Sequence, residues 1–204
     1  MGFYERRILP WLLDVAMSAK PITYQRRKVV PLAEGRVLEI GIGAGQNLAF
    51  DDPSKVSHIW GLEPSAEMRE RARARAAGLS IGLDFLDLKA EEIPLDDKSA
   101  DTVLVTYTLC TIPDVARALK GMRRVLKPGG RLIFCEHGRA PDEDVRRWQQ
   151  RITPIWKVIG GGCHVGRPIP ELIREGGFES EKLETMYLPS TPRFAGYNYW
   201  GTAR

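Results

Sequence analysis

The chain has 204 residues and a formal net charge of +4, a length that suits one domain with a substantial core. No apolar run approaches the roughly 20 residues of a membrane-spanning helix, and residues 1–14 lack the apolar core of a signal peptide. Cys110, Cys135 and Cys163 are odd in number and widely spaced. This spacing fits neither a disulfide framework nor a zinc motif, so we expect no metal and a reducing, cytoplasmic location.

Residues 3–30 are predicted to be helical, with a kink at Pro10 and a break near Pro21. Their apolar side chains recur at helical spacing, which indicates one buried face. Three interpretations are open: a helix packed on the domain, a lid over a ligand, or a helix at a membrane surface. We therefore treat residues 1–34 as an N-terminal helical cap, and peripheral membrane contact stays open.

A buried strand is predicted over 37–40, and a glycine-rich turn follows it at once. Gly41, Gly43 and Gly45 lie two residues apart, which permits positive φ and lets a ligand approach the backbone closely. A short helix is expected from residue 46, with its free N–H groups directed at the ligand. The stretch indicates a nucleotide-type site at the first strand of an α/β sheet.

A second strand, over 56–62, ends in Glu63-Pro64-Ser65. Glu63 lies 18 residues after Gly45, a spacing at which a carboxylate accepts hydrogen bonds from both ribose hydroxyls of a nucleoside. Ser65 is a suitable N-cap for a helix over 66–77. The arginines of that helix spread around its surface, which predicts a solvated face and no nucleic-acid partner.

The remaining pattern alternates between strands and helices. Strands are predicted over 81–87, 102–106 and 131–135, and a helix over 115–126 ends at a Lys-Pro-Gly-Gly stop. The alternation predicts a Rossmann-like, doubly wound α/β sheet with helices on both faces. Ligands bind such sheets at the carboxyl ends of the strands, where the chain carries Glu39, Glu63, Ala90, Glu91, Thr106, Tyr107, Glu136 and His137.

Beyond residue 138, helices are predicted over 142–151 and 167–176, with strands over 181–188 and 195–204. These two strands would complete a sheet of seven, mostly parallel with one antiparallel strand. The whole chain is thus predicted to be a single domain. Its core would span 35–137, and 138–204 would supply substrate-side helices and the last two strands.

Five motifs occur in order: Glu39-x-Gly41-x-Gly43-x-Gly45, Glu63-Pro64-Ser65, Ala90-Glu91-x-x-Pro94, Asp101-x-Val103 and Val125-Leu126-Lys127-Pro128-Gly129-Gly130. Together they resemble the class I S-adenosylmethionine-dependent methyltransferases, over about residues 35–137. The resemblance implies S-adenosyl-L-methionine as cofactor and S-adenosyl-L-homocysteine as product. The cofactor-binding positions that it implies are Glu39, Gly41, Ile42, Gly43, Gly45, Asn47, Glu63, Pro64, Ala90, Glu91 and Thr106.

One position departs from this family pattern. Many relatives carry an aspartate just before the alanine of the third motif, where its oxygen binds the adenine amine. Lys89 stands there in this chain. The resemblance therefore implies that backbone groups or Glu91 bind the adenine instead.

A second set of motifs narrows the resemblance: Leu109-Cys110, Glu136-His137, Trp148-Gln149-Gln150, Pro154-x-Trp156, Gly161-Gly162-Cys163 and Gly201-x-Ala203. They are similar to those of the alkyl-thiol S-methyltransferases and, more loosely, of the quinone and phospholipid methyltransferases. This implies a small, partly apolar acceptor, with a thiol or similar soft nucleophile as first choice. The alternatives are methylation of a phospholipid headgroup or quinone, and a sensor that binds S-adenosylmethionine without catalysis.

Candidate catalytic residues follow from the chemistry of a thiol, which must lose its proton to become the nucleophile. His137 is the candidate general base, because its unperturbed pKa is near 6.5; the alternative is a histidine that only hydrogen-bonds a loop. His164 is a second candidate, and His58, inside a strand, is expected to be structural. Tyr107 is expected to orient the acceptor, and Cys163 either to line the substrate site or to be buried.

Overall fold

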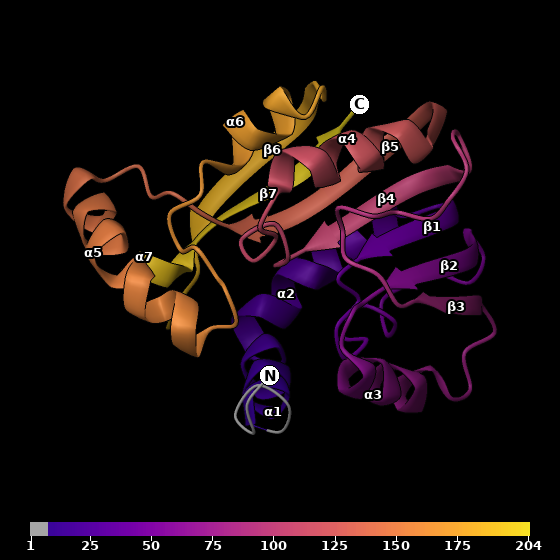
Figure 1. Cartoon of the computed structure of the whole chain (residues 1–204), viewed down its shortest axis with the longest axis horizontal. Helices are drawn as coiled ribbons and strands as arrows, with labels where there is room; N and C mark the ends of the chain where they lie inside the picture. The colour runs from indigo at the N-terminus through magenta and orange to yellow at the C-terminus, as the bar shows by residue number, and fades with distance from the viewer. Residues whose placement is uncertain (1–7) are drawn as a thin grey trace.

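The computed structural model describes residues 8–204 and contains one seven-stranded sheet, in the order β3-β2-β1-β4-β5-β7-β6 (Figure 1). Strand β7 is antiparallel to both of its neighbours, and the pairings from β3 to β5 are parallel. The predicted sheet is therefore confirmed. The strands are β1 Gly35–Ile40, β2 Val56–Leu62, β3 Gly82–Leu86, β4 Ala100–Thr106, β5 Leu126–His137, β6 Ser180–Tyr187 and β7 Tyr197–Ala203.

Helices cover both faces of the sheet. In Figure 1, α4 and α6 lie above it, α1, α2 and α3 lie below it, and α5 and α7 stand at the carboxyl end of β5. The bounds are α1 Leu9–Met17, α2 Lys20–Val29, η2 Val30–Leu32, α3 Ala66–Ala76, α4 Val115–Val125, α5 Glu143–Ile159, α6 Ile169–Glu175 and α7 Arg193–Gly196.

Two apolar clusters hold these layers together. One lies between the sheet and the helices α4 and α6, and includes Leu38, Leu119 and Phe134. The other lies on the opposite face, where Val29 and Val30 pack against the central strands. The central strands β1 and β4 are thus covered on both sides, which explains their continuous apolar sequences.

The N-terminal helices differ from their prediction at Pro10. Pro10 lies in the first turn of α1, and Pro21 in the first turn of α2. Proline is tolerated there, because the N–H that it lacks has no partner within the helix. The predicted break near Pro21 is confirmed, because α1 ends at Met17 and α2 begins at Lys20, whereas Pro10 begins a helix and does not kink one. Residues 3–7 of the predicted segment lie outside the described part.

Helix α5 is longer than the predicted 142–151, and it continues through Pro154 to Ile159. Gln149, which is 1% exposed, anchors the middle of this helix. Its amide nitrogen donates to the carbonyl oxygens of Gly138, Val165 and Phe194, and its amide oxygen accepts from the Ala140 N–H. These contacts hold the helix against the segment after β5, the loop before α6 and helix α7, which offsets the hydrogen bond lost at the proline.

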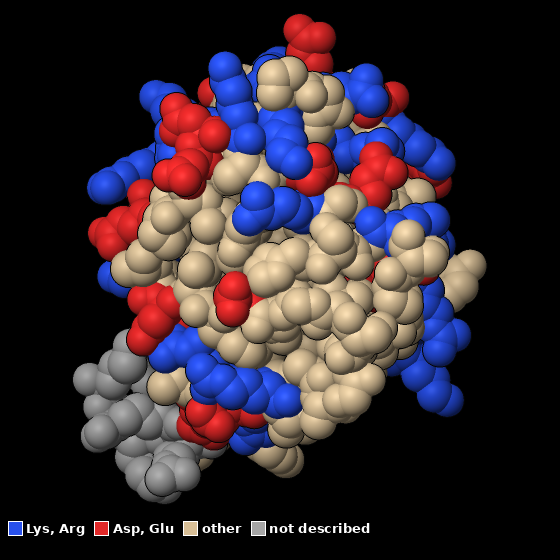
Figure 2. Space-filling view, turned by 90° about the vertical axis from the view of Figure 1, so that its right-hand side faces the viewer, with Lys and Arg blue, Asp and Glu red and all other residues tan. Residues whose placement is uncertain are grey.

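The face in Figure 2 carries lysine, arginine, aspartate and glutamate side chains interspersed around a broad area without charged groups. Such mixing agrees with the solvated surface expected from the mild net charge. The arginines of α3 are a partial exception. Arg69 is only 8% exposed, and its guanidinium donates to the Glu63 carbonyl and the Asp87 carboxylate.

Candidate active site

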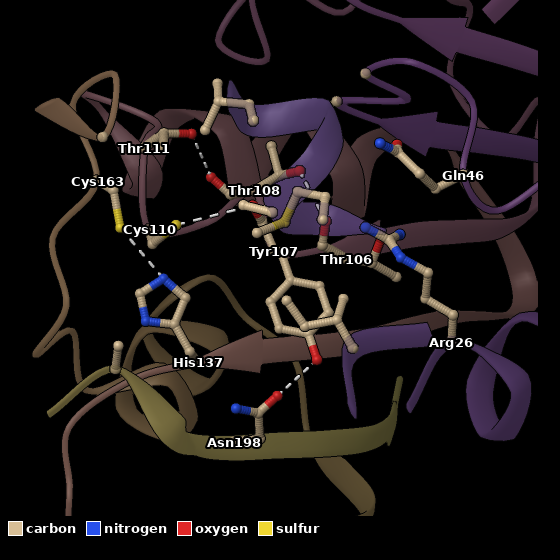
Figure 3. Close-up of a pocket in the computed structure, with 18 of the residues that line it drawn as sticks. Arg26, Gln46, Thr106, Tyr107, Thr108, Cys110, Thr111, His137, Cys163 and Asn198 are labelled. Carbon is tan, nitrogen blue, oxygen red and sulfur yellow. Dashed lines mark hydrogen bonds between the residues drawn. The ribbon is translucent and has the colours of Figure 1, made fainter. Parts of the chain in front are cut away.

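A cavity of about 400 Å³ opens at the carboxyl ends of the central strands. Its lining comes from the turn after β1, the ends of β2, β4 and β5, the helices α1 and α2, and the segments around α5 and α7. The crevice predicted at the strand ends is therefore present. Figure 3 shows its central side chains, with Arg26 and Gln46 near one end and Cys163 and His137 near the other.

The glycine turn forms the first end of the cavity. Gly41, Gly43 and Gly45 all have positive φ, of 65°, 56° and 81°. A Cβ atom at Gly41 would lie 2.5 Å from Cγ2 of Thr108, so only glycine fits where the turn crosses the loop after β4. Gly41, Ile42 and Gly43 line the cavity as predicted, whereas Gly45 packs against Ala72 outside the lining.

The helix expected from residue 46 is absent, and residues 41–50 form successive turns. Their hydrogen bonds run from the N–H of Gly45 to the carbonyl of Ile42 and from that of Phe50 to that of Asn47. The prediction of helix N–H groups aimed at the ligand was therefore wrong. Asn47 explains the difference, because its side chain turns inward to a buried polar cluster instead of continuing a helix.

Glu63 lies directly beside the glycine turn and lines the cavity. One carboxylate oxygen accepts from the Gly43 N–H at 3.2 Å, and the other accepts from the Ser65 N–H at 2.9 Å. Burial raises the pKa of Glu63, and these backbone N–H groups oppose that shift. The predicted pairing of loop and carboxylate is thus present, and each oxygen keeps a lone pair for a further donor.

A buried polar cluster supports the turn from below. The Asn47 amide donates to Glu39 at 2.8 Å, and the Arg26 guanidinium donates to Asn47 at 2.5 Å and to Thr106 at 2.7 Å. Burial raises the pKa of Glu39, and the nearby Asp51 carboxylate raises it further. Glu39 and Asn47 lie beneath the cavity wall, whereas Thr106 and Arg26 line it.

Three other predicted cofactor positions lie outside the lining. Ala90 belongs to the apolar cluster under α4, and the Glu91 carboxylate accepts from the Asp114 N–H at 3.1 Å. Pro64 also lies outside the residues that line the cavity. Their roles stay predictions, and those of Ala90 and Glu91 depend on a part of the ligand that extends beyond this cavity.

Helices α1 and α2 close one side of the cavity with Leu13, Ala16, Met17 and Ile22. Asp14 fastens α1 to α3, because its carboxylate pairs with Arg71 at 3.2 Å and with Arg75 at 2.7 Å. These two arginines were expected to be solvated; Arg75 is exposed, whereas Arg71 is half-buried. Their partner could not be inferred from α3 alone, since it lies more than 50 residues earlier in the chain.

Tyr107 lies in the middle of the cavity, between its two ends (Figure 3). Its φ is 54°, a left-handed conformation uncommon for a bulky residue. Its phenol donates to the Asn198 side chain on β7 at 2.7 Å, and burial raises its pKa well above the ordinary value. The strained backbone and this bond together fix the ring in place, where it was predicted to orient an acceptor.

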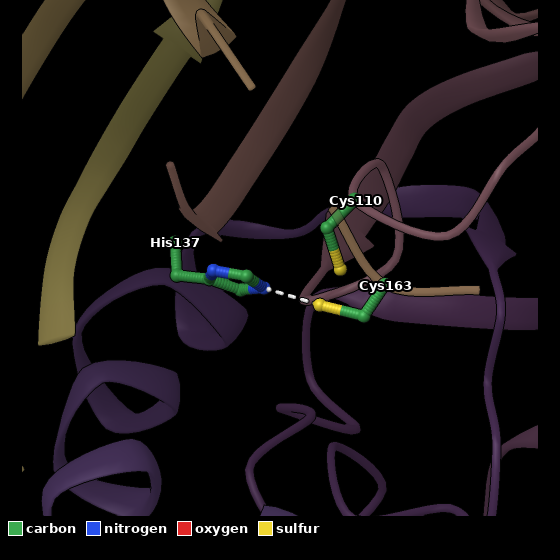
Figure 4. Close-up of side chains that lie close together, drawn as sticks. All are labelled: Cys110, His137 and Cys163. Atoms are coloured by element: carbon green, nitrogen blue, oxygen red, sulfur yellow. Dashed lines mark hydrogen bonds between the residues drawn. The ribbon is translucent and has the colours of Figure 1, made fainter. Parts of the chain in front are cut away.

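The far end of the cavity contains Cys110, His137 and Cys163, which we call the Cys–His cluster (Figure 4). The Cys163 sulfur lies 3.2 Å from Nε2 of His137, and one ligand atom from each residue lies within 4.8 Å of the others. All three residues line the cavity. His137 is where the sequence predicted it, but the cluster was not predicted, because its members come from two separate loops and the end of β5.

The members of the Cys–His cluster shift one another's pKa values. The Cys110 thiol and the His137 ring, both in contact with the Cys163 sulfur, hold the pKa of Cys163 below its ordinary value against the opposing effect of burial. Burial opposes the charging of His137, but contact with Cys163 raises its pKa overall. The pair is thus disposed toward a thiolate beside an imidazolium. Nδ1 of His137 is buried and has no hydrogen-bond partner among the described residues.

The other two histidines lie away from the cavity lining. His58 on β2 pairs with Asp84 on β3 at 3.2 Å, which agrees with its expected structural role. His164 follows Cys163, and burial lowers its pKa. Because His164 lies outside the cavity lining, its predicted role as a base is weakened.

Comparisons with known proteins find similarity to methyltransferases. A family model described as a methyltransferase domain matches residues 38–134. The chain is 31% identical over 170 residues to thiol S-methyltransferase TMT1B of Rattus norvegicus, a match covering 80% of this chain and 70% of that protein. The chain belongs to the class I S-adenosylmethionine-dependent methyltransferases. This methyltransferase is also 30% identical over 190 residues to TMT1B of Homo sapiens, covering 88% of this chain and 77% of that protein.

One further relative covers a smaller share of this chain, and one solved structure shares its fold. A demethylmenaquinone methyltransferase of Clavibacter sepedonicus is 35% identical, over 59% of this chain and 49% of its own length. A methyltransferase structure from Thermotoga maritima superposes with a TM-score of 0.67 at 25% identity, over 98% of this chain and 96% of that one. Among residues 8–204, no helix of this methyltransferase has both the length and the apolar character needed to cross a bilayer.

Proposed function

We propose that this methyltransferase transfers a methyl group from S-adenosylmethionine to a small, partly apolar thiol. The observation that carries the proposal is the position of the Cys–His cluster. It lies in the same cavity as the glycine turn and Glu63, and Figure 3 shows Cys163 and His137 at the end away from Gln46, the residue that follows Gly45. The thiol S-methyltransferase relatives, at 30–31% identity over most of both chains, support the choice of acceptor.

The donor end fits S-adenosylmethionine. Glu63 is partly buried and, within residues 8–204, accepts one hydrogen bond at each carboxylate oxygen, which leaves room for two ribose hydroxyls. A Cβ atom at Gly43 would have Cε of Met68 as its nearest neighbour, at 3.6 Å, so the backbone there is open to a ligand. The missing side chains of the glycine turn thus leave a cradle next to a suitable carboxylate.

The bound cofactor supplies a sulfonium methyl group that is already activated for displacement. The chain's own residues align the reactants, and alignment can account for most of the acceleration of such a reaction. Leu13 and Met17 on one side, with Trp156 and Phe194 on the other, make the cavity apolar. Exclusion of water by these side chains favours attack by a soft nucleophile.

An acceptor thiol must lose its proton before the transfer. In His137, Nε2 faces the Cys163 sulfur, so Nδ1 is the ring nitrogen without a partner among the described side chains. We assign proton acceptance to this nitrogen in the neutral ring, in which the Nε2–H donates to the Cys163 thiolate, and the orientation of the acceptor to Tyr107. Both residues line the cavity, in accordance with the catalytic roles inferred from the sequence.

Quinone methylation is the second candidate. It is favoured by the identity of 35% to the demethylmenaquinone methyltransferase, although that match spans only about half of the relative. A quinol would use the same donor end and would place its ring in the apolar part of the cavity. It has no need of the Cys–His cluster, which is why we rank it below a thiol.

The test is transfer of a labelled methyl group from S-adenosylmethionine to a panel of alkyl thiols, aryl thiols, quinols and amines of similar size. We expect the label in thioethers. Methylated quinols without thioethers would contradict the thiol assignment and support the second candidate. Tight cofactor binding with no product from any acceptor would instead favour a sensor of S-adenosylmethionine.

A further inference from the structure

We propose that Cys110, His137 and Cys163 form a zinc site whose fourth position faces the cavity. If the proposed function holds, that position binds the acceptor thiolate. The three ligand atoms converge on one point in Figure 4 and lie within 4.8 Å of one another. The sequence predicted no metal, because the intervals of 27 and 26 residues between these positions match no zinc motif.

The distances suit a tetrahedral ion. Zinc binds cysteine sulfur at about 2.3 Å and histidine nitrogen at about 2.0–2.1 Å, so ligand atoms in a tetrahedral site are separated by roughly 3.5–3.8 Å. The Cys163 sulfur and Nε2 of His137 lie 3.2 Å apart, and no pair in the cluster exceeds 4.8 Å. Small side-chain rotations would therefore bring all three atoms to bonding distance.

The choice of metal follows from the ligand set. Two thiolates and one imidazole are soft to intermediate ligands, which favour zinc over magnesium or calcium. Among the described residues, the cluster contains three metal-binding side chains and no fourth. Three protein ligands with one open position are typical of catalytic zinc, whereas structural zinc sites are closed by four.

Hydrogen bonds hold the two cysteine-bearing loops and the end of β5 together before any ion binds. The His164 N–H donates to the Cys110 carbonyl at 2.9 Å, which joins the two cysteine-bearing loops. The Arg167 guanidinium donates to the carbonyls of Leu109 and Ile112, on either side of Cys110. Glu136, next to His137, accepts from the Thr108 and Leu109 N–H groups. Such support restricts ligand orientation, as partners around a metal site do.

The open position has a direct chemical use. An alkyl thiol that binds zinc releases its proton to solvent and remains bound as a thiolate. Its sulfur then forms a bond to the methyl carbon, the bond from that carbon to the sulfonium sulfur breaks, and the bonding electrons stay on the departing thioether. The neutral methylated product is a weaker ligand than the thiolate and leaves the ion. In the zinc-bound enzyme, the ion replaces Nδ1 of His137 as the group that activates the acceptor thiol.

The first experiment measures metal in tag-free protein prepared in zinc-supplemented medium and dialysed against metal-free buffer. We expect about one zinc ion per chain by plasma mass spectrometry. Replacement by cobalt(II) should produce thiolate-to-cobalt charge-transfer absorption, which requires cysteine ligation. Zinc at background level together with no such absorption would overturn the proposal, as would a Cys110–Cys163 disulfide in the freshly prepared protein.

Variants locate the ion. Cys110→Ser and His137→Ala should each lose most of the bound zinc, and Cys110→Ser should lose most of the cobalt charge-transfer intensity. Cys135→Ser is the matched control, because Cys135 is also a buried free thiol but lies outside the Cys–His cluster. Its zinc content should equal that of the unaltered protein. Equal zinc loss in Cys135→Ser and Cys110→Ser would contradict the assignment. Circular dichroism of each variant excludes unfolding as the cause.

The two proposals can fail separately. If the unaltered protein binds zinc but methylates no thiol, the acceptor assignment fails and the metal site stands. If metal-free protein methylates thiols as fast as protein reloaded with zinc, the role of the ion fails and the proposed function stands. Loss of thiol transfer on chelation, with recovery on addition of zinc and unchanged binding of S-adenosylmethionine by calorimetry, would support both.

Discussion

The two ends of the cavity differ in how they are assembled from the chain. At the donor end, the glycine turn and Glu63 lie within about 20 residues of each other and contact the ligand space partly through backbone. At the acceptor end, the Cys–His cluster spans residues 110 to 163 and acts only through side chains. A ligand site made by one turn and the next strand can be read as a motif. A site made by two loops and the end of another strand exists only after the sheet has formed.

The largest expected effect is a loss of activity at the acceptor end that leaves cofactor binding at the donor end unchanged. His137→Ala should lower turnover of a thiol by about 10²–10⁴-fold, the usual range when a group that moves or controls a proton is lost. Affinity for S-adenosylmethionine should stay the same, because Glu63 and the glycine turn are untouched. Steady-state kinetics and calorimetry on the same protein measure both. A parallel fall in cofactor affinity would mean that the ends are not independent.

The next effect concerns the buried carboxyl group under the donor end. Burial raises the pKa of Glu39 above its ordinary value of 4.5, so the folded state holds its proton more tightly than the unfolded state. This contribution to stability is present below about pH 4.5 and is lost as the pH rises toward the folded-state pKa. At about 1.4 kcal/mol for each pKa unit, the free energy of unfolding should fall by roughly 2–4 kcal/mol between pH 5 and pH 8.

Glu39→Gln should remove part of that fall, because burial also raises the pKa values of Asp51 and Glu136 to about 7; urea denaturation at the two pH values would measure the difference. The control is Glu34→Gln, since Glu34 is a half-exposed partner of Arg131 at the surface. The control should keep the fall of the unaltered protein. A Glu39→Gln variant with the same pH dependence as the control would exclude Glu39 as its source.

Two glycines of the donor turn form a matched pair. Alanine at Gly41 would place Cβ 2.5 Å from Cγ2 of Thr108, whereas alanine at Gly43 would meet nothing nearer than 3.6 Å. Both positions have positive φ. We expect Gly41→Ala to lower the free energy of unfolding by about 2–4 kcal/mol, from strain and overpacking together, and Gly43→Ala by about 1 kcal/mol from strain alone. Equal losses in chemical denaturation would contradict the close approach at Thr108.

The smallest effect tests the cofactor contact itself. Glu63→Ala should weaken binding of S-adenosylmethionine by about 1–3 kcal/mol, because hydrogen bonds to a charged acceptor are lost. Calorimetry measures the change. Glu67→Ala, in the first turn of α3 and paired with Arg71, is the control and should leave the affinity unaltered. Unchanged affinity in Glu63→Ala would remove Glu63 from the cofactor site.

Local patterns determined most of the fold. The buried strand before Gly41, the N-cap at Ser65 and the helix stop at 127–130 predicted the order of strands and helices, because propensity and chain reversal act over a few residues. They failed where tertiary contacts override them. Residues 46–50 form turns instead of a helix, because Asn47 is drawn into the buried cluster with Glu39 and Arg26.

The candidate site also has one part that local sequence predicts and one part that depends on tertiary contacts. Glu63 beside the glycine turn follows from sequence, since parallel strands next to each other place their carboxyl ends together. The sequence also determined that His137 stands at a strand end, but not that Cys110 and Cys163 meet it. That convergence depends on how the loop after β4 and the segment after α5 pack over the end of β5. Packing between distant segments is a property of the folded chain, so only the tertiary structure decided which groups surround the acceptor.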